Sequence, residues 1–258
     1  LNPTLTVEQL EVGCQLALEY DVASVCIMPY YLRRCADLLK GSTVKASTTI
    51  GFPHGGHTTD VKRAEAERAI ADGCEELDMV VNVSQVLSGR WDYVRQEIQE
   101  ITNAAHSAGQ KIKVIFENCY LQDSHKIRLC EICGELNCDW VKTSTGYGTG
   151  GATLADLTLM REHSPPHVQV KAAGGIRKGE FPAVTRRSSS LSPGFPGAIA
   201  KWFPSFCFAP SSVSKRSGER RVDDDGPWQV KQRSEKMGRI SRLNSTVCAT
   251  ARPGSRSR

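Results

Sequence analysis

The first part of the sequence alternates regularly between strand-like and helix-like segments. Six short β-rich runs lie at 23–28, 44–52, 76–82, 111–117, 140–145 and 168–173. Segments with helical periodicity lie at 6–20, 31–39, 60–72, 91–108, 124–136 and 154–162, with short links between them. Strands that alternate with helices form a parallel sheet, because each helix returns the chain to the same end of the sheet. The sequence therefore predicts an α/β fold with six parallel strands, open or closed into a barrel.

The composition changes abruptly at Arg177. From this residue to the end the chain holds 17 Lys and Arg against 6 Asp and Glu, whereas the part before it is net acidic. Residues 178–258 contain 14 Ser and 7 Pro and show no lasting period. Such a composition buries too little apolar surface to offset the entropy of the chain. We predict an α/β domain at 1–177 and a basic Ser/Pro/Arg-rich tail at 178–258 that is mostly disordered.

The cysteines and the apolar runs bear on location and partners. Ten cysteines are scattered along the chain, several of them inside apolar runs, which is typical of reduced thiols and favours the cytoplasm. No apolar run is long enough to cross a membrane, and none at the start resembles a signal peptide. The Cys130, Cys133 and Cys138 group lacks a clear fourth metal ligand, so packing is favoured over a metal site. The irregular charges of the tail predict salt-sensitive sticking rather than specific nucleic-acid binding.

Charged residues interrupt the strands in a pattern of period two. Asp78 and Asn82 alternate with Leu77, Met79 and Val81, and the next strand has Lys113 and Glu117 opposite its apolar residues. Lys142 and Lys171 occupy the equivalent face of the last two strands. One lysine at a strand end commonly reaches solvent. Charged side chains from four strands that face one interior are costly to bury, unless they form ion pairs or take part in catalysis. We predict a functional site on this face.

Two lysines beside a carboxylate suggest chemistry at a carbonyl group. A lysine attacks a carbonyl only as the neutral amine, and burial and a second cation both favour that form. Lys142 and Lys171, on adjacent strands, provide such a pair, and Asp78 is placed for general acid–base catalysis through a water. The set predicts an imine followed by carbon–carbon cleavage or formation, which requires no metal and no redox cofactor.

Glycine-rich turns follow the two lysine strands. Residues 146–151 contain Gly146, Gly148 and Gly151, and residues 174–175 are both glycine. Such turns bind phosphate through backbone N–H groups or are simply tight turns, and either turn alone leaves both interpretations open. The first turn also matches the dinucleotide pattern G-x-G-x-x-G, which would indicate an oxidoreductase. That pattern is weak evidence, because no acidic residue ends a following strand about 20 residues on.

Five strings of residues carry a resemblance to a known family. They are GFPHGG (51–56), ELDMVVN (76–82), KVIFEN (113–118), VKTSTGYGTGGAT (141–153) and VKAAGGIR (170–177). In this order they resemble the 2-deoxyribose-5-phosphate aldolases, which are class I aldolases with a TIM-type (β/α) barrel. The resemblance implies reversible cleavage of the phosphosugar 2-deoxy-D-ribose 5-phosphate to D-glyceraldehyde 3-phosphate and acetaldehyde in deoxyribonucleotide and carbohydrate catabolism. It implies no cofactor and leaves a homo-oligomer open.

The resemblance also assigns roles to single residues. It implies that Lys142 forms the Schiff base, that Lys171 lowers its pKa and that Asp78 transfers protons. It implies that four residues bind the phosphate, namely Gly146, Gly174, Gly175 and Arg177. Cys26 corresponds to a residue near the site in some members, and we expect Lys113, Glu117 and Asn82 to lie next to the site.

The resemblance ends on both sides of residues 1–177. The first and the last of the eight barrel strands are not recognisable, so we predict an incomplete barrel with six strands and two open edges. A catalytically impaired aldolase homologue is therefore an alternative to an active aldolase. Two further interpretations stay open at this point, a dinucleotide-dependent oxidoreductase and a non-catalytic chain whose basic tail binds a partner.

Overall fold

A computed structural model describes residues 1–176, 206–207 and 246–251 of the chain. Seven α-helices and eight strands lie in this part. The helices are α1 (Val7–Glu19), α2 (Leu32–Leu39), α3 (Thr59–Ala71), α4 (Val83–Leu87), α5 (Trp91–Ser107), α6 (Asp123–Glu135) and α7 (Leu154–Glu162). The strands are β1 (Val22–Ile27), β2 (Lys45–Ile50), β3 (Glu76–Val80), β4 (Lys111–Ile115), β5 (Trp140–Lys142), β6 (Gln169–Lys171), β7 (Phe206–Cys207) and β8 (Thr246–Ala251).

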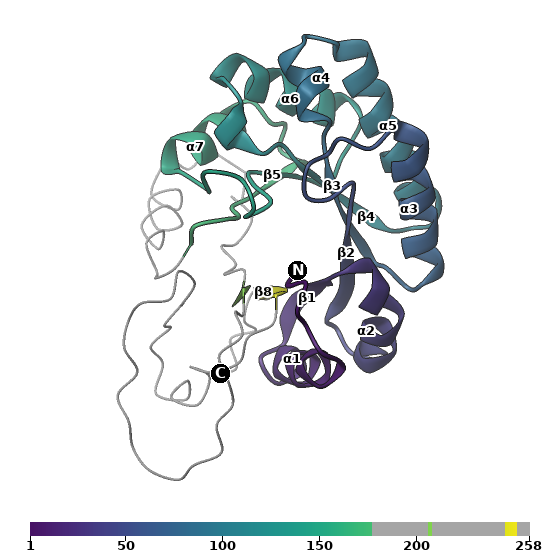
Figure 1. Cartoon of the computed structure of the whole chain (residues 1–258). Coiled ribbons are helices and arrows are strands. Elements are labelled where there is room, and N and C mark those ends of the chain that lie inside the picture. Colours follow the sequence, from purple (N-terminus) through teal and green to yellow (C-terminus); the bar gives the residue numbers. More distant parts are fainter. Residues whose placement is uncertain (177–205, 208–245, 252–258) are drawn as a thin grey trace.

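Strands β1 to β6 form a parallel sheet in the order of the chain. The sheet is curved, and the helices cover its outer, convex side, so that together they form a half-barrel (Figure 1). This arrangement confirms the prediction of six parallel strands in an incomplete barrel. Helix α4 is an addition to the predicted helices; the side chain of Asn82 caps it by accepting a hydrogen bond from Gln85 N at 3.4 Å.

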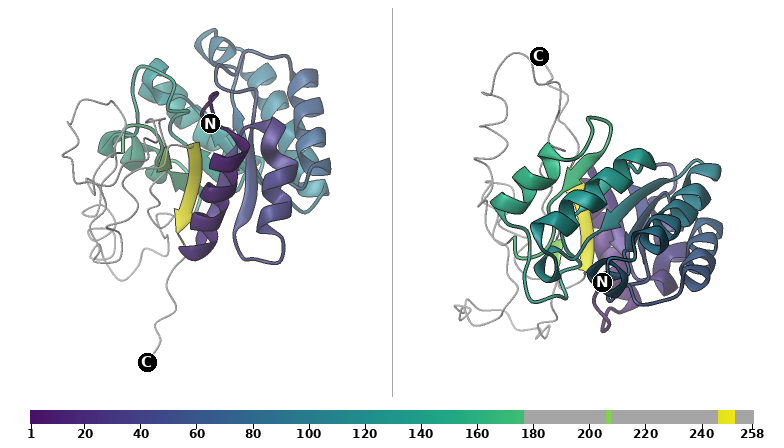
Figure 2. Two further views of the ribbon diagram at one scale, coloured as in Figure 1. Left: turned by 60° about the horizontal axis from the view of Figure 1, so that its bottom comes forward. Right: turned by 90° about the horizontal axis from the view of Figure 1, so that it is seen from above.

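The outer edge of β1 is paired, contrary to the prediction of two open edges. Strand β8 runs antiparallel to β1, and β7 runs antiparallel to β8 (Figure 2). Unpaired N–H and C=O groups at a sheet edge bind any segment with suitable propensity. The sequence of β8 has suitable propensity, because it contains the β-branched residues Thr246, Val247 and Thr250. The run is too short for its periodicity to have predicted a strand. The rest of 178–258 lies outside the described residues, so the disorder and the nucleic-acid behaviour expected there stay predictions.

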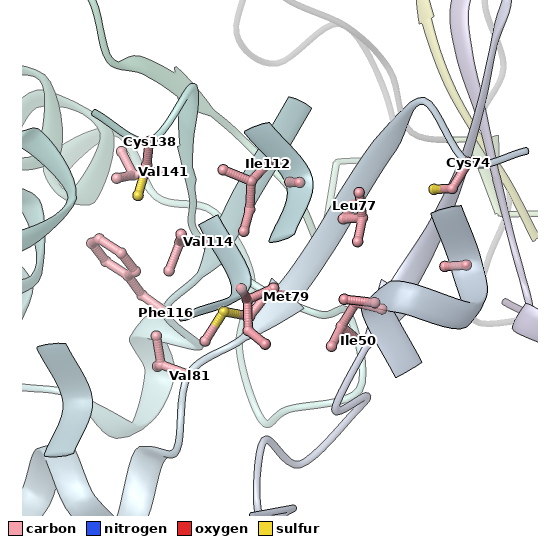
Figure 3. Packing of buried hydrophobic residues seen from close by; sticks show 14 of the residues in the cluster. Ile50, Cys74, Leu77, Met79, Val81, Ile112, Val114, Phe116, Cys138 and Val141 are labelled. Atoms are coloured by element: carbon pink, nitrogen blue, oxygen red, sulfur yellow. The ribbon is translucent and has the colours of Figure 1, made fainter. Parts of the chain in front are cut away.

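The hydrophobic core lies between the sheet and the helices. Leu77, Met79, Ile112 and Val114 point from β3 and β4 into this layer, and all four are fully buried (Figure 3). Because successive side chains of a strand alternate between faces, the residues between them point to the inside of the half-barrel. No helix in residues 1–176 has the length and the apolarity needed to cross a membrane.

A buried ion pair outside the predicted site fixes the end of β3. Lys62 Nζ of α3 donates to Glu97 Oε1 of α5 at 2.6 Å and to the carbonyl of Val80 at 2.7 Å, and both charged side chains are fully buried. Glu97 Oε2 accepts a hydrogen bond from Asn82 N at 2.9 Å. Burial lowers the pKa of Lys62 and raises that of Glu97. The charge of each residue acts in the opposite direction, because it stabilises the charged form of its partner. The pair joins two helices to the strand that carries Asp78.

Replacing Lys62 with methionine should lower the free energy of unfolding by about 3–5 kcal/mol, because Glu97 would remain buried without a counter-ion. The double variant Lys62→Met/Glu97→Leu should regain at least half of this loss, since two apolar side chains leave no buried charge. Urea unfolding of the three proteins measures both effects. A double variant as unstable as the single one would contradict the prediction.

Candidate active site

The charged residues of the strands meet on the inner face of the half-barrel. Asp78 of β3 is opposite Lys113 of β4 in the register of the sheet, and Lys142 of β5 is opposite Lys171 of β6. All four side chains are buried, with Asp78 completely inaccessible. The prediction of a shared interior is therefore confirmed for these four residues, whereas Asn82 and Glu117, predicted to share it, lie beyond the ends of β3 and β4.

Asp78 is the centre of this cluster. Its Oδ2 accepts a hydrogen bond from Lys142 Nζ at 2.6 Å, and its Oδ1 accepts one from Lys113 Nζ at 3.0 Å. The hydroxyl of Ser47, on β2, lies 3.4 Å from Oδ1 and donates to it. Lys113 also forms an ion pair with Glu76. Four adjacent strands thus contribute to one network around a single carboxylate.

Opposing effects determine the ionisation of this network. Burial raises the pKa of Asp78, but Lys113, Lys142 and Lys171 outweigh burial and hold the pKa far below its usual value. Burial also lowers the pKa of Lys113, yet the carboxylates of Asp78 and Glu76 raise it above the ordinary lysine value. Asp78 and Lys113 are therefore charged at neutral pH. Three lysines against two carboxylates leave the cluster one positive charge in excess when all are ionised.

The two glycine-rich turns pack against each other at the ends of β5 and β6. A Cβ atom on Gly151 would lie 2.4 Å from the carbonyl carbon and oxygen of Gly174, so this approach requires glycine. Gly146, Gly174 and Gly175 have φ angles of 88°, 76° and 71°, which side chains disfavour. Arg177, predicted to bind phosphate, lies outside the described residues.

Three further residues were predicted to lie next to the site. Cys26 is buried and lies away from the main core, in a small apolar group with Leu1. Glu117 is buried at the end of β4, where its carboxylate accepts hydrogen bonds from Thr145. The Asn82 side chain is engaged as the cap of α4, where it also accepts a hydrogen bond from the Ser84 hydroxyl at 2.9 Å.

Two members of the cluster were not predicted from the sequence. Glu76 shares the face of Asp78, because it lies two residues before it on β3, and this alternation was visible in the sequence. Ser47 follows the same rule on β2. Small hydroxyl side chains are common in strands, so Ser47 carried no distinctive signal.

The eight cysteines of residues 1–176 are reduced thiols, and all of them except Cys119 are buried. Cys130, Cys133 and Cys138 are buried in the core around α6. Within the described residues, no three His, Cys, Asp or Glu side chains are grouped so that they could hold a metal ion. The three cysteines thus pack as small apolar side chains.

Comparison with known proteins identifies the family of the chain. The family model of DeoC/LacD family aldolases matches residues 2–200. The chain is 74% identical over 177 residues to a deoxyribose-phosphate aldolase of Rhodopirellula baltica, covering 69% of this chain and 73% of that protein. It is 46% identical over 182 residues to the deoxyribose-phosphate aldolase of Thermococcus gammatolerans, covering 70% and 81%.

Comparison with solved structures also points to the aldolases. The deoxyribose phosphate aldolase of Aeropyrum pernix, described as a tetramer, superposes with a TM-score of 0.64 at 31% identity. The match covers 69% of this chain and 75% of that chain. These findings favour the aldolase prediction over the dinucleotide-dependent oxidoreductase. The chain belongs to the DeoC/LacD family of aldolases.

Proposed function

We propose that the chain cleaves 2-deoxy-D-ribose 5-phosphate reversibly into D-glyceraldehyde 3-phosphate and acetaldehyde through an imine on Lys142. The observation that carries this proposal is the direct contact of 2.6 Å between Lys142 Nζ and a carboxylate that three lysines keep charged. The aldolases named above, which are 74% and 46% identical to the chain, support the choice of substrate.

The first step is attack of the neutral Lys142 amine on C1 of the open-chain sugar. The excess positive charge of the cluster, to which Lys171 beside Lys142 in the register contributes, favours loss of one proton. Asp78 accepts the proton directly or through a water and returns it to the carbinolamine oxygen, which leaves as water. The product of this step is a protonated imine at C1.

Cleavage follows because the protonated imine withdraws electrons from C2. The C3 hydroxyl loses its proton, the C2–C3 bond breaks, and its electron pair forms an enamine between C1 and C2. C3 becomes the aldehyde of glyceraldehyde 3-phosphate. A proton then adds to C2, water hydrolyses the imine, and acetaldehyde leaves with the amine of Lys142 restored. Asp78 serves these transfers as the proton relay, while Gly146, Gly174, Gly175 and Arg177 are proposed to bind the phosphate.

The proposal is tested by reducing the imine with borohydride in the presence of acetaldehyde. We expect an ethylated Lys142 in the peptide digest, because the reduced imine no longer hydrolyses. Lys40, which is exposed, reports the background of non-specific reductive alkylation in the same digest. Equal labelling of Lys142 and Lys40 would refute the proposal.

We further propose that the protein acts in the cytoplasm and as a homo-oligomer. No cysteine of residues 1–176 forms a disulfide, which supports a reducing compartment. The tetrameric description of the Aeropyrum pernix enzyme supports an assembly of identical chains.

A further inference from the structure

Glu117, two residues after the end of β4, has an unusual backbone conformation. Its φ and ψ angles are 58° and 60°, in the left-handed region, and its side chain is buried. A residue other than glycine in this region costs about 1–2 kcal/mol, so other contacts must stabilise it. Residues in such strained conformations persist where the surrounding structure holds them, and they concentrate at functional sites.

The carboxylate of Glu117 binds the chain that follows β5. Thr145 N donates to both carboxylate oxygens, at 3.3 and 3.2 Å, and the Thr145 hydroxyl donates to Oε2. The same hydroxyl accepts a hydrogen bond from Tyr147 N at 3.0 Å. The carboxylate is thus linked through one threonine to the backbone two residues further on.

The turn at 145–151 packs closely against the Glu117 carboxylate and also against Phe52. A Cβ atom on Gly148 would lie 3.0 Å from Glu117 Cδ, so the turn lies against the glutamate. Tyr147 meets Phe52, which follows β2, edge to face with ring centroids 5.4 Å apart. The turn begins three residues after Lys142, on the same stretch of chain.

We infer that Glu117 is a positioning residue that fixes the turn at 145–151 and so sets the affinity for the phosphorylated substrate. The affinity part rests on the proposed function, since it requires that this turn meets the phosphosugar. The geometric part does not depend on it. A carboxylate suits this task because it accepts both Thr145 donors, whereas an amide in its place would set its own NH2 group against one of them.

Three variants separate the hydrogen bonds from simple packing. Glu117→Gln removes one acceptor with little change of shape, Thr145→Val removes the hydroxyl, and Thr145→Ser keeps it. Glu75→Gln is the matched control. Glu75 precedes β3, is partly exposed and forms an ion pair with Lys45.

The first measurement is amide hydrogen exchange in peptides that cover 145–151. We expect exchange about tenfold faster in Glu117→Gln and in Thr145→Val, with Thr145→Ser and Glu75→Gln close to the unchanged protein. The double variant Glu117→Gln/Thr145→Val should exchange no faster than either single variant, because both break one linkage. Unchanged exchange in Glu117→Gln, or effects that add in the double variant, would overturn the inference.

The second measurement is the kinetics of 2-deoxy-D-ribose 5-phosphate cleavage. In Glu117→Gln we expect KM to rise about tenfold while kcat changes less than about threefold. Imine trapping with acetaldehyde, which has no phosphate, should stay within about twofold. A fall in kcat at constant KM would contradict the affinity part. If the unchanged protein traps no imine, the proposed function fails, and hydrogen exchange alone still decides the geometric part.

Discussion

Replacing Lys142 with alanine is expected to abolish imine trapping with acetaldehyde and to slow aldol cleavage roughly 10⁴-fold or more. The physical reason is that the amine is the covalent partner of the substrate, so its loss removes the whole reaction path rather than one stabilising contact. We expect that Lys171 does not replace Lys142 as the nucleophile. The proton relay, Asp78, is placed to serve Lys142, from which it accepts a hydrogen bond. Peptide mass spectrometry after reduction, together with steady-state rates, measures both effects.

The arginine variant of the same residue is the matched control. Lys142→Arg keeps a positive charge beside Asp78 but remains protonated, so it has no neutral amine to offer. It should fold about as stably as the unchanged protein and yet trap no imine. If either variant still shows a trapped adduct at the normal rate on Lys171 or Lys113, the assignment of Lys142 is wrong.

The sequence predicted the strands and their inner face because both depend on local periodicity. Alternation of apolar and charged residues in β3 and β4 determines which side chains point inward, and parallel order then brings Asp78 next to Lys113. Lys142, 64 positions after Asp78, follows from the same rule. The contacts among them could not be predicted, since they depend on how strongly the sheet curves.

Glu117 lies beyond the reach of local periodicity. Period two, continued past β4, places Glu117 on the same face as Lys113, but β4 ends at Ile115 and the chain then turns left-handed. The tertiary contact with Thr145, which local periodicity does not reveal, stabilises that conformation. The pairing of β8 with β1 was missed for a related reason, because it joins segments more than 200 residues apart in the chain.

Replacing Asp78 with asparagine is expected to lower the free energy of unfolding by about 3–5 kcal/mol at pH 7. The carboxylate is fully buried and in contact with Lys142 and Lys113. Its removal takes the counter-ion from Lys142 and leaves Lys113 with Glu76 alone. We expect cleavage to slow about 10²–10⁴-fold as well, since the amide cannot relay protons. Urea unfolding and steady-state kinetics measure the two losses separately.

The difference in the free energy of unfolding between the unchanged protein and Asp78→Asn should depend on pH in a defined direction. Burial raises the pKa of Asp78, but the three lysines outweigh it, so the pKa in the folded protein lies below the value of about 3.9 in the unfolded chain. The stabilisation by Asp78 is therefore fully present above about pH 4 and declines as the pH falls below that value. The gap between the unchanged protein and Asp78→Asn should narrow in this acid range, and a gap that widens there would contradict the assignment.

A second substitution separates charge balance from catalysis. Glu76→Gln is the matched control for Asp78→Asn, because Glu76 lies on the same strand, pairs with Lys113 alone among the described residues and is less deeply buried. Its effect on the stability and on the rate should be smaller. In Asp78→Asn/Lys113→Met the cluster returns to one excess positive charge, but Glu76 loses its ion-pair partner, so only part of the lost stability should return. The rate should not return, because the relay beside Lys142 is still missing. If the rate recovers together with the stability, Asp78 acts only as a counter-ion, and the proton relay must lie elsewhere.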